Sequence, residues 1–169
     1  MNENVFWQLI QESLNESNGE LKDQHEVLIT MLSKYEPEEI IEFDKIFNKF
    51  YVKSYTSDLW AAAYIINGGC YDDDFDYFRS WLISRGKKVY EESINNPGGL
   101  VDVISIYEAG DVEFEDFLYI ASDAYKVRTS QDDFYNKVIR IAVPKINLTW
   151  SENEEELEKM FPELVEKFW

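Results

Sequence analysis

The sequence predicts an all-α protein: a single compact domain of about seven to nine helices, with a short C-terminal helical tail docked on it. Three observations support this fold class. Apolar residues recur at helical spacing over most of the chain, and helix start and stop signals separate the segments. The β-branched stretch 101–106 has no alternating neighbour with which to form a sheet. With 169 residues, of which 45% are hydrophobic, the chain is long enough to bury a core.

Three helices are expected at the N-terminal end. Apolar residues at helical spacing predict them over residues 5–14, 21–35 and 37–51. An Asn-Gly pair ends the first helix, and Pro37 stands in the first turn of the third, where proline is favoured. The third helix carries a broad apolar stripe and is expected to be the longest.

The central segments give the clearest signals. Residues 59–66 are hydrophobic on every side, so we expect their helix in the middle of the core. Thr56 supplies N-cap chemistry before this helix, and an Asn-Gly-Gly sequence supplies a left-handed C-cap after it. A helix over 72–83 then begins with three aspartates at the positive end of its dipole, and a bend at Arg85 leads into a shorter helix over 87–94.

The second half of the chain has a weaker pattern. Helices are expected over 100–109, 114–126 and 134–143, followed by an extended or irregular segment over 144–150. A short acidic helix after Ser151 and a last turn or two from Pro162 complete the chain. Bulky apolar residues at the C-terminal end predict that this tail docks on the body of the protein.

The charge limits the classes of partner. There are 34 acidic and 16 basic residues, a net charge of −18, which repels nucleic acid and anionic membranes and would attract a basic protein. Residues 1–44 hold 11 acids and 2 bases, residues 45–90 hold 5 and 7, and residues 91–169 hold 18 and 7. The middle is therefore the least acidic part. Neither a secretory signal nor a membrane span is found, so a soluble, cytoplasmic protein is expected.

A resemblance to a known family is carried by the central motif. The sequence LWAAAYIINGGC over 59–70, followed by Asp72-Asp73, Phe75 and YFRSWLISRG over 77–86, closely resembles the core signature of the domain of unknown function 4240. Supporting similarity extends over most of the chain: Phe6-Trp7, Phe43-Asp44, Val89-Tyr90 and Phe161 to Leu164. The resemblance implies a bacterial, mainly helical, cytoplasmic protein, and it supplies no catalytic residues. We place a single domain over 1–169, with a family-like core at about 5–127 and a tail at about 128–169.

The least acidic segment also contains the candidate functional surface. Four basic residues fall within ten positions near the bend after the central motif, where arginine and a flexible glycine are able to bind an anion. With the neighbouring polar and aromatic residues they define one candidate ligand surface: Asn67, Tyr71, Asp72, Arg79, Arg85 and Lys87. The competing interpretation is structural, because acids at the start and bases at the end of a helix match its dipole.

Known catalytic and metal-binding patterns fail one by one. Asp72 begins a D-x-D-x-D sequence, but Tyr77 and Ile83 stand where a calcium loop needs glycine and glutamate. One cysteine, Cys70, and one histidine, His25, are too few for most zinc sites and are not brought together by any pattern. We expect no metal and no cofactor, and we expect Cys70 to be a packed thiol.

Two functions from different classes remain. The favoured one is a non-catalytic interaction or regulatory module whose acidic surfaces meet a basic protein partner, with an immunity-like or inhibitor-like role within this class. Neither nucleic acid nor a membrane is expected as a partner. The alternative is a small anionic-ligand binder, or an enzyme of unrecognised type, with a pocket near Asn67 to Lys87. The lack of a catalytic constellation favours the first.

Overall fold

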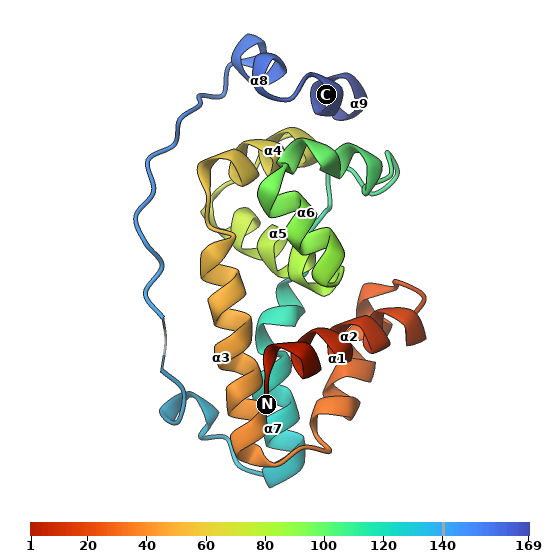
Figure 1. Ribbon diagram of the computed structural model, residues 1–169, viewed down its shortest axis with the longest axis vertical. Helices are drawn as coiled ribbons and strands as arrows, with labels where there is room; N and C mark the ends of the chain where they lie inside the picture. Colours follow the sequence, from red (N-terminus) through yellow and green to blue (C-terminus); the bar gives the residue numbers. More distant parts are fainter. Residues whose placement is uncertain (140) are drawn as a thin grey trace.

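A computed structural model describes residues 1–139 and 141–169, and all regular secondary structure within those ranges is helical (Figure 1). The predicted fold class is confirmed. The helices, in order, are α1 (Glu3–Glu16), α2 (Leu21–Leu32), α3 (Pro37–Lys53), α4 (Ser57–Asn67), α5 (Asp72–Ser84), α6 (Lys87–Asn95), the 3-10 helices η1 (Pro97–Asp102) and η2 (Glu115–Tyr119), α7 (Ile120–Thr129), the 3-10 helix η3 (Phe134–Asn136), α8 (Glu154–Met160) and α9 (Pro162–Phe168). None of these helices has the length and apolar character needed to cross a bilayer.

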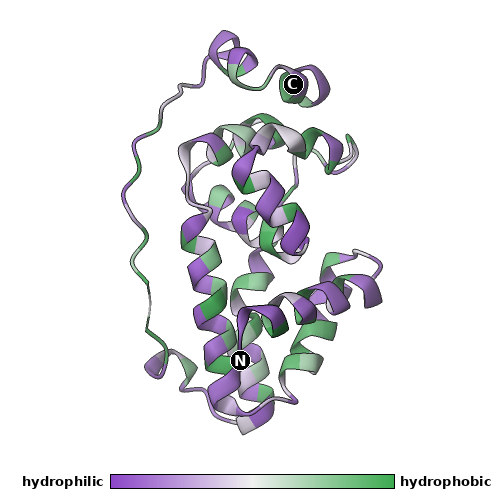
Figure 2. Ribbon diagram, in the orientation of Figure 1, coloured by the Kyte–Doolittle hydropathy of each residue, from purple (hydrophilic) through white to green (hydrophobic). Residues whose placement is uncertain are grey.

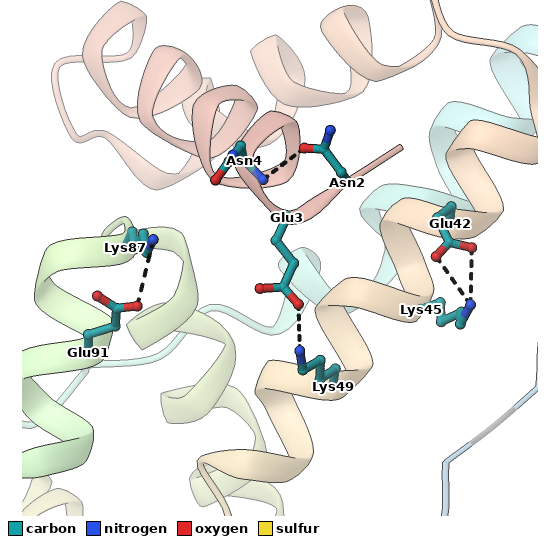
Figure 3. A network of polar contacts seen from close by, with 8 residues as sticks. All are labelled: Asn2, Glu3, Asn4, Glu42, Lys45, Lys49, Lys87 and Glu91. Carbon is teal, nitrogen blue, oxygen red and sulfur yellow. Dashed lines mark hydrogen bonds and ion pairs between the residues drawn. The ribbon is translucent and has the colours of Figure 1, made fainter.

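Helices α1, α2, α3 and α7 form one half of the body. The α1 and α2 helices pack as a hairpin, and α7 lies against both α2 and α3 (Figure 1). The side chain of Asn2 caps α1 by accepting a hydrogen bond from the Asn4 amide at 3.0 Å (Figure 3). Phe6 of α1 packs against the rings of Phe43 and Phe50 of α3, so aromatic contacts join the two helices. Apolar faces turn inward and polar faces outward along these helices (Figure 2).

Helices α4, α5 and α6 form the other half. Thr56 caps α4, and Gly68 ends it in the left-handed conformation with φ of 66°, as the sequence predicts. The ring of Trp60 stacks on Phe75 of α5 with centroids 4.7 Å apart, and its indole N–H donates to the Cys70 carbonyl at 2.8 Å. These contacts hold α4 and α5 together across the short turn between them.

The C-terminal segment from residue 141 onward, which we call the arm, runs along one side of the body and ends beside α4 (Figure 1). We call residues 137–150 the strap and the helices α8 and α9 the clip. After a turn at residue 137 and a bend at 138, the described part of the strap runs as an extended segment (Figure 1), and at its end the Trp150 indole N–H donates to the Ser57 carbonyl at 2.9 Å. The clip packs on α4 and η1, and its Leu157 and Leu164 are completely buried. The all-round apolar character of α4 is thus explained, because the clip covers its outer face. The predicted docking of the tail is confirmed.

Two of the helices expected in the second half are corrected by the structure. The expected helix over 100–109 is replaced by η1 followed by turns, because Pro97 and two glycines start a tight 3-10 segment that does not continue as α-helix. The expected helix over 114–126 begins with η2, and α-helix starts only at Ile120. Residues 111–114 have no regular secondary structure, and the side chains of Val112 and Phe114 are buried in the core.

The helix expected over 134–143 is also wrong. Only η3 forms, and residues 137–139 and 141–143 have no helical structure; Arg140 lies outside the described residues. Phe134 is buried against Tyr125 of α7, with ring centroids 5.5 Å apart. Beyond this anchor the chain offers no amphipathic face to the body, so nothing compensates the cost of nucleating a helix. The predicted irregular segment over 144–150 is confirmed.

Candidate functional site

The six residues of the predicted surface do not converge on one site. Tyr71 and Asp72 stand at the start of α5, whereas Arg85 and Lys87 follow its end. The helix has 13 residues, so its ends lie about 20 Å apart at about 1.5 Å per residue. A ligand of metabolite size does not reach both groups. The structure therefore divides the candidate surface into an acidic end and a basic end.

Arg79 lies inside the protein between these ends. Its side chain is 0% exposed, and its Nη1 donates to the Tyr51 carbonyl at 2.6 Å, while Nη2 pairs with the Asp76 carboxylate. The guanidinium carbon is 3.8 Å from the ring centroid of Tyr51 and 4.7 Å from that of Tyr55. Within the described residues its Nε has no hydrogen-bond partner. Arg79 thus joins α5 to the end of α3, and its polar groups face the interior.

Arg85 is mostly buried and joins two further elements. Its Nη1 donates to the Gly19 carbonyl at 3.1 Å in the turn between α1 and α2, and its Nη2 pairs with the Gln24 side-chain oxygen. Burial lowers the pKa of Arg85 to about 10. Gln24, which sequence reasoning missed, is fully buried and donates to the Ser84 carbonyl at 2.9 Å. Gln24 lies four residues before Leu28, and this helical spacing was the signal in the sequence that Gln24 is on the buried face of α2.

The start of α5 carries the first exposed part of the candidate surface. Asn67 exchanges hydrogen bonds with the backbone of Val112, at 3.1 and 3.3 Å, and so joins the end of α4 to the segment 111–114. Tyr71 is 77% exposed, and its amide donates to the Asp74 carboxylate at 2.8 Å. Asp72 is exposed beside it. Asn67 is therefore a positioning residue, whereas Tyr71 and Asp72 are open to a partner.

Carboxylates from two distant segments meet at this end. The Phe114 amide donates to the Tyr77 carbonyl at 3.1 Å, which holds the segment 111–116 against α5. Partial burial and the neighbouring Asp111, Asp74 and Glu115 carboxylates raise the pKa of Glu113. Neither 71–76 nor 108–116 contains a lysine or arginine. We call the resulting surface the acidic edge; its members are Asp72, Asp73, Asp74, Asp111, Glu113 and Glu115.

The basic end opens onto a groove between α1 and α6. The groove has a volume of about 600 Å³ and is lined by side chains of both helices: Asn4, Trp7, Gln8, Gln11, Lys87, Lys88, Glu91 and Glu92. Lys87 faces Glu91 at 3.9 Å one turn along α6 (Figure 3), and Lys88 faces Glu92 at the same distance. In the described part of the chain no side chain caps the start of α6.

The described residues offer few groups suited to nucleophilic or metal chemistry. Cys70 is 4% exposed, as predicted, and burial together with the Asp74 carboxylate raises the pKa of its thiol to about 12. The His25 ring lies 3.7 Å from Asp123 of α7 and not beside the thiol of Cys70. Among the described residues, the His, Cys, Asp and Glu side chains form no group of three or more that could hold a metal ion.

The protein is a helical domain. Its candidate functional residues either are buried, as Arg79 is, or lie at one of two surfaces, the acidic edge and the groove between α1 and α6. The model of the family described as "Protein of unknown function (DUF4240)" matches residues 1–127 of the chain. The protein therefore belongs to the DUF4240 family, and the resemblance seen in the central motif is confirmed at the level of the family. No curated protein and no solved structure matches the chain. The match ends within α7, so the strap and the clip lie outside it.

Proposed function

We propose that the protein is a non-catalytic interaction module of the cytoplasm whose acidic edge binds a basic segment of a partner protein. The observation that supports this most is the convergence of carboxylates from two segments, 71–76 and 108–116, neither of which contains a lysine or arginine. Such a surface steers a cationic partner during association and rejects acidic ones. Exposed Tyr71 adds an aromatic ring on which an arginine or lysine is able to stack.

The internal position of the arginines supports the same proposal. Arg79 and Arg85 serve the packing of α5, so neither arginine is offered at the Tyr71 end of this helix to substrate phosphates or carboxylates. A module of this kind acts by covering a basic surface of another protein. This is how an inhibitor, an immunity protein or a regulator of a basic enzyme works. Its own chain then needs shape and charge but no reactive group.

Charge reversal at the acidic edge tests the proposal. The triple variant Asp73→Lys, Glu113→Lys and Glu115→Lys is expected to weaken binding of a fluorescein-labelled, arginine-rich peptide about tenfold or more. Fluorescence anisotropy measures this affinity, and binding of the unmodified protein should weaken as salt is added, because the attraction is screened.

A matched variant separates the edge from the overall charge. Glu12→Lys, Glu16→Lys and Glu158→Lys alter exposed carboxylates on α1 and α8 and change the charge by the same amount, from −18 to −12 through three reversals of two units. We expect this control to keep its affinity within about twofold. Equal weakening of both variants would show that the net charge, and not the edge, attracts the peptide.

A small anionic ligand is the second candidate, and the groove between α1 and α6 favours it. Lys87 and Lys88 flank an open start of α6, where backbone N–H groups and the helix dipole attract an anion. The paired Glu91 and Glu92 counteract this attraction, which is why we place this function second.

Phosphate binding decides this second candidate. If the groove binds anions, inorganic phosphate should shift the amide NMR signals of residues 87–89. The double variant Lys87→Ala, Lys88→Ala should abolish this shift. The control Lys34→Ala with Lys45→Ala removes two exposed lysines elsewhere and should leave the shift intact. The groove is not a phosphate site if the unmodified protein shows no shift at these residues.

A further inference from the structure

The strap differs in charge from the rest of the chain. Residues 137–150 contain Lys137, Arg140 and Lys145 and not a single acid, a net charge of +3. The remaining residues therefore carry −21, since the whole chain carries −18. The strap is also apolar at nine of its other positions, through valine, isoleucine, leucine, alanine, proline and tryptophan. A cationic, apolar segment on the outside of an acidic protein needs a physical explanation.

The strap is held extended with its backbone open. From 141 to 148 the described backbone groups form no hydrogen bonds; the first is donated by the Thr149 amide to Ser57 Oγ at 2.9 Å. Apolar side chains along it face solvent: Ile139 is 89% exposed, and Ile141 and Val143 are nearly half exposed. Hydrophobic residues, in green, stand beside hydrophilic ones, in purple, along this segment in Figure 2. Unpaired, extended backbone with exposed apolar side chains has the properties of a free edge strand.

One edge of this strand is more complete than the other. In an extended strand the N–H and C=O of successive residues point to opposite edges. Pro144 lacks an N–H, so it interrupts the edge formed by the even-numbered residues. The odd-numbered residues, from Ile139 to Asn147, keep every donor and acceptor. The sequence therefore allows a second strand to pair without interruption along the odd-numbered edge.

An apolar pocket adjoins the strap. It has a volume of about 280 Å³ and lies between the strap and α3, where it is lined mainly by Ile41, Val138, Ile139 and Ile141. A pocket of this size admits an aliphatic side chain of an added strand. Anchors at both ends keep the strap extended before any partner arrives: Phe134 against α7, and Trp150 against α4. A preorganised strand loses less conformational entropy on binding.

We propose that the strap is a docking strand that pairs, by β-strand addition along its odd-numbered edge, with an acidic extended segment of a partner protein. The open backbone supplies the hydrogen bonds, and the pocket beside Ile41 takes one apolar side chain. Lys137 already pairs with Asp133 at 3.3 Å, so the remaining positive charge of the strap, which includes Lys145, selects an acidic sequence. This site is separate from the acidic edge and takes a partner of the opposite charge. It does not depend on the function proposed above.

Two proline variants test the edge. The probe is a fluorescein-labelled ten-residue peptide of alternating glutamate and valine, and fluorescence anisotropy measures its affinity for the full chain. Val143→Pro removes a donor from the odd-numbered edge and should weaken binding about tenfold or more. Ala142→Pro makes the same change on the already interrupted edge and should leave binding within about twofold. Val143→Ala controls for the lost side chain, and circular dichroism checks that each variant stays helical.

Several outcomes would overturn the proposal. It is wrong if the unmodified protein does not bind the peptide, or if both proline variants weaken binding equally. It is also wrong if the unmodified protein self-associates in sedimentation velocity and the two proline variants abolish this self-association. In that case the strap pairs with a second copy of the same chain. Binding to vesicles of anionic phospholipid without binding to the peptide would assign the strap to a membrane surface. The arginine-rich peptide used for the acidic edge should bind all three strap variants unchanged.

Discussion

Replacement of Arg79 by alanine is expected to lower the free energy of unfolding by about 3 to 5 kcal/mol. The change removes a fully buried side chain, leaves a cavity against the rings of Tyr51 and Tyr55, and deprives the Tyr51 carbonyl of its donor. Urea unfolding followed by circular dichroism measures the loss. A loss below about 1 kcal/mol would show that the buried guanidinium contributes little to the fold.

Arg79→Met separates volume from charge. Methionine fills most of the space but donates no hydrogen bond, so we expect a smaller loss of about 1 to 3 kcal/mol. Burying a charge is itself costly, and an apolar residue of similar size avoids that cost. If methionine proves as harmful as alanine, the hydrogen bond to Tyr51 and the contact with Asp76 dominate the role of this arginine.

Replacement of Leu164 by alanine is expected to release the clip. The side chain is completely buried, and its truncation should reduce the stability of docking by about 2 to 5 kcal/mol. Helices α8 and α9 have seven residues each, which is too short for either to persist when undocked. Faster amide hydrogen exchange in α4 and faster proteolysis of the strap report the release.

A neighbouring exposed residue provides the control for this variant. Glu163→Ala alters the preceding position of α9 without changing buried area, so exchange in α4 should stay as it is in the unmodified protein. Unchanged exchange in Leu164→Ala would mean that the α4 face is protected without the clip.

Local signals account for the parts of the fold that were predicted. Thr56 and Gly68 cap α4 as expected, and Pro37 opens α3, because capping depends on the residue and its immediate neighbours. The 3-10 helix η2 was not predictable in this way. The segment before it is positioned by burial of Val112 and Phe114, and no pattern near residue 112 indicates a contact with Asn67.

The candidate site was predicted less well than the fold, for a related reason. Arg79 and Arg85 lie in a sequence that looks like charge matched to a helix dipole, and their partners at Tyr51 and Gly19 are far away in the chain. Tertiary contacts decide whether such a cation is internal or exposed. Tyr71 and Asp72 were singled out from sequence, but the acidic edge also needs residues 111–116, which only the folded chain brings beside them.

The contact between the arm and α4 joins residues that are far apart in the sequence and are therefore synthesised at different times. Thr149 bonds to Ser57 across 92 positions, so a growing chain exposes the outer face of α4 long before the segment that covers it has been made. Local helix pairs such as α1 and α2 are able to form early, whereas closure of this face waits for the last residues. The outer face of α4 therefore stays uncovered for as long as synthesis takes to reach the strap and the clip.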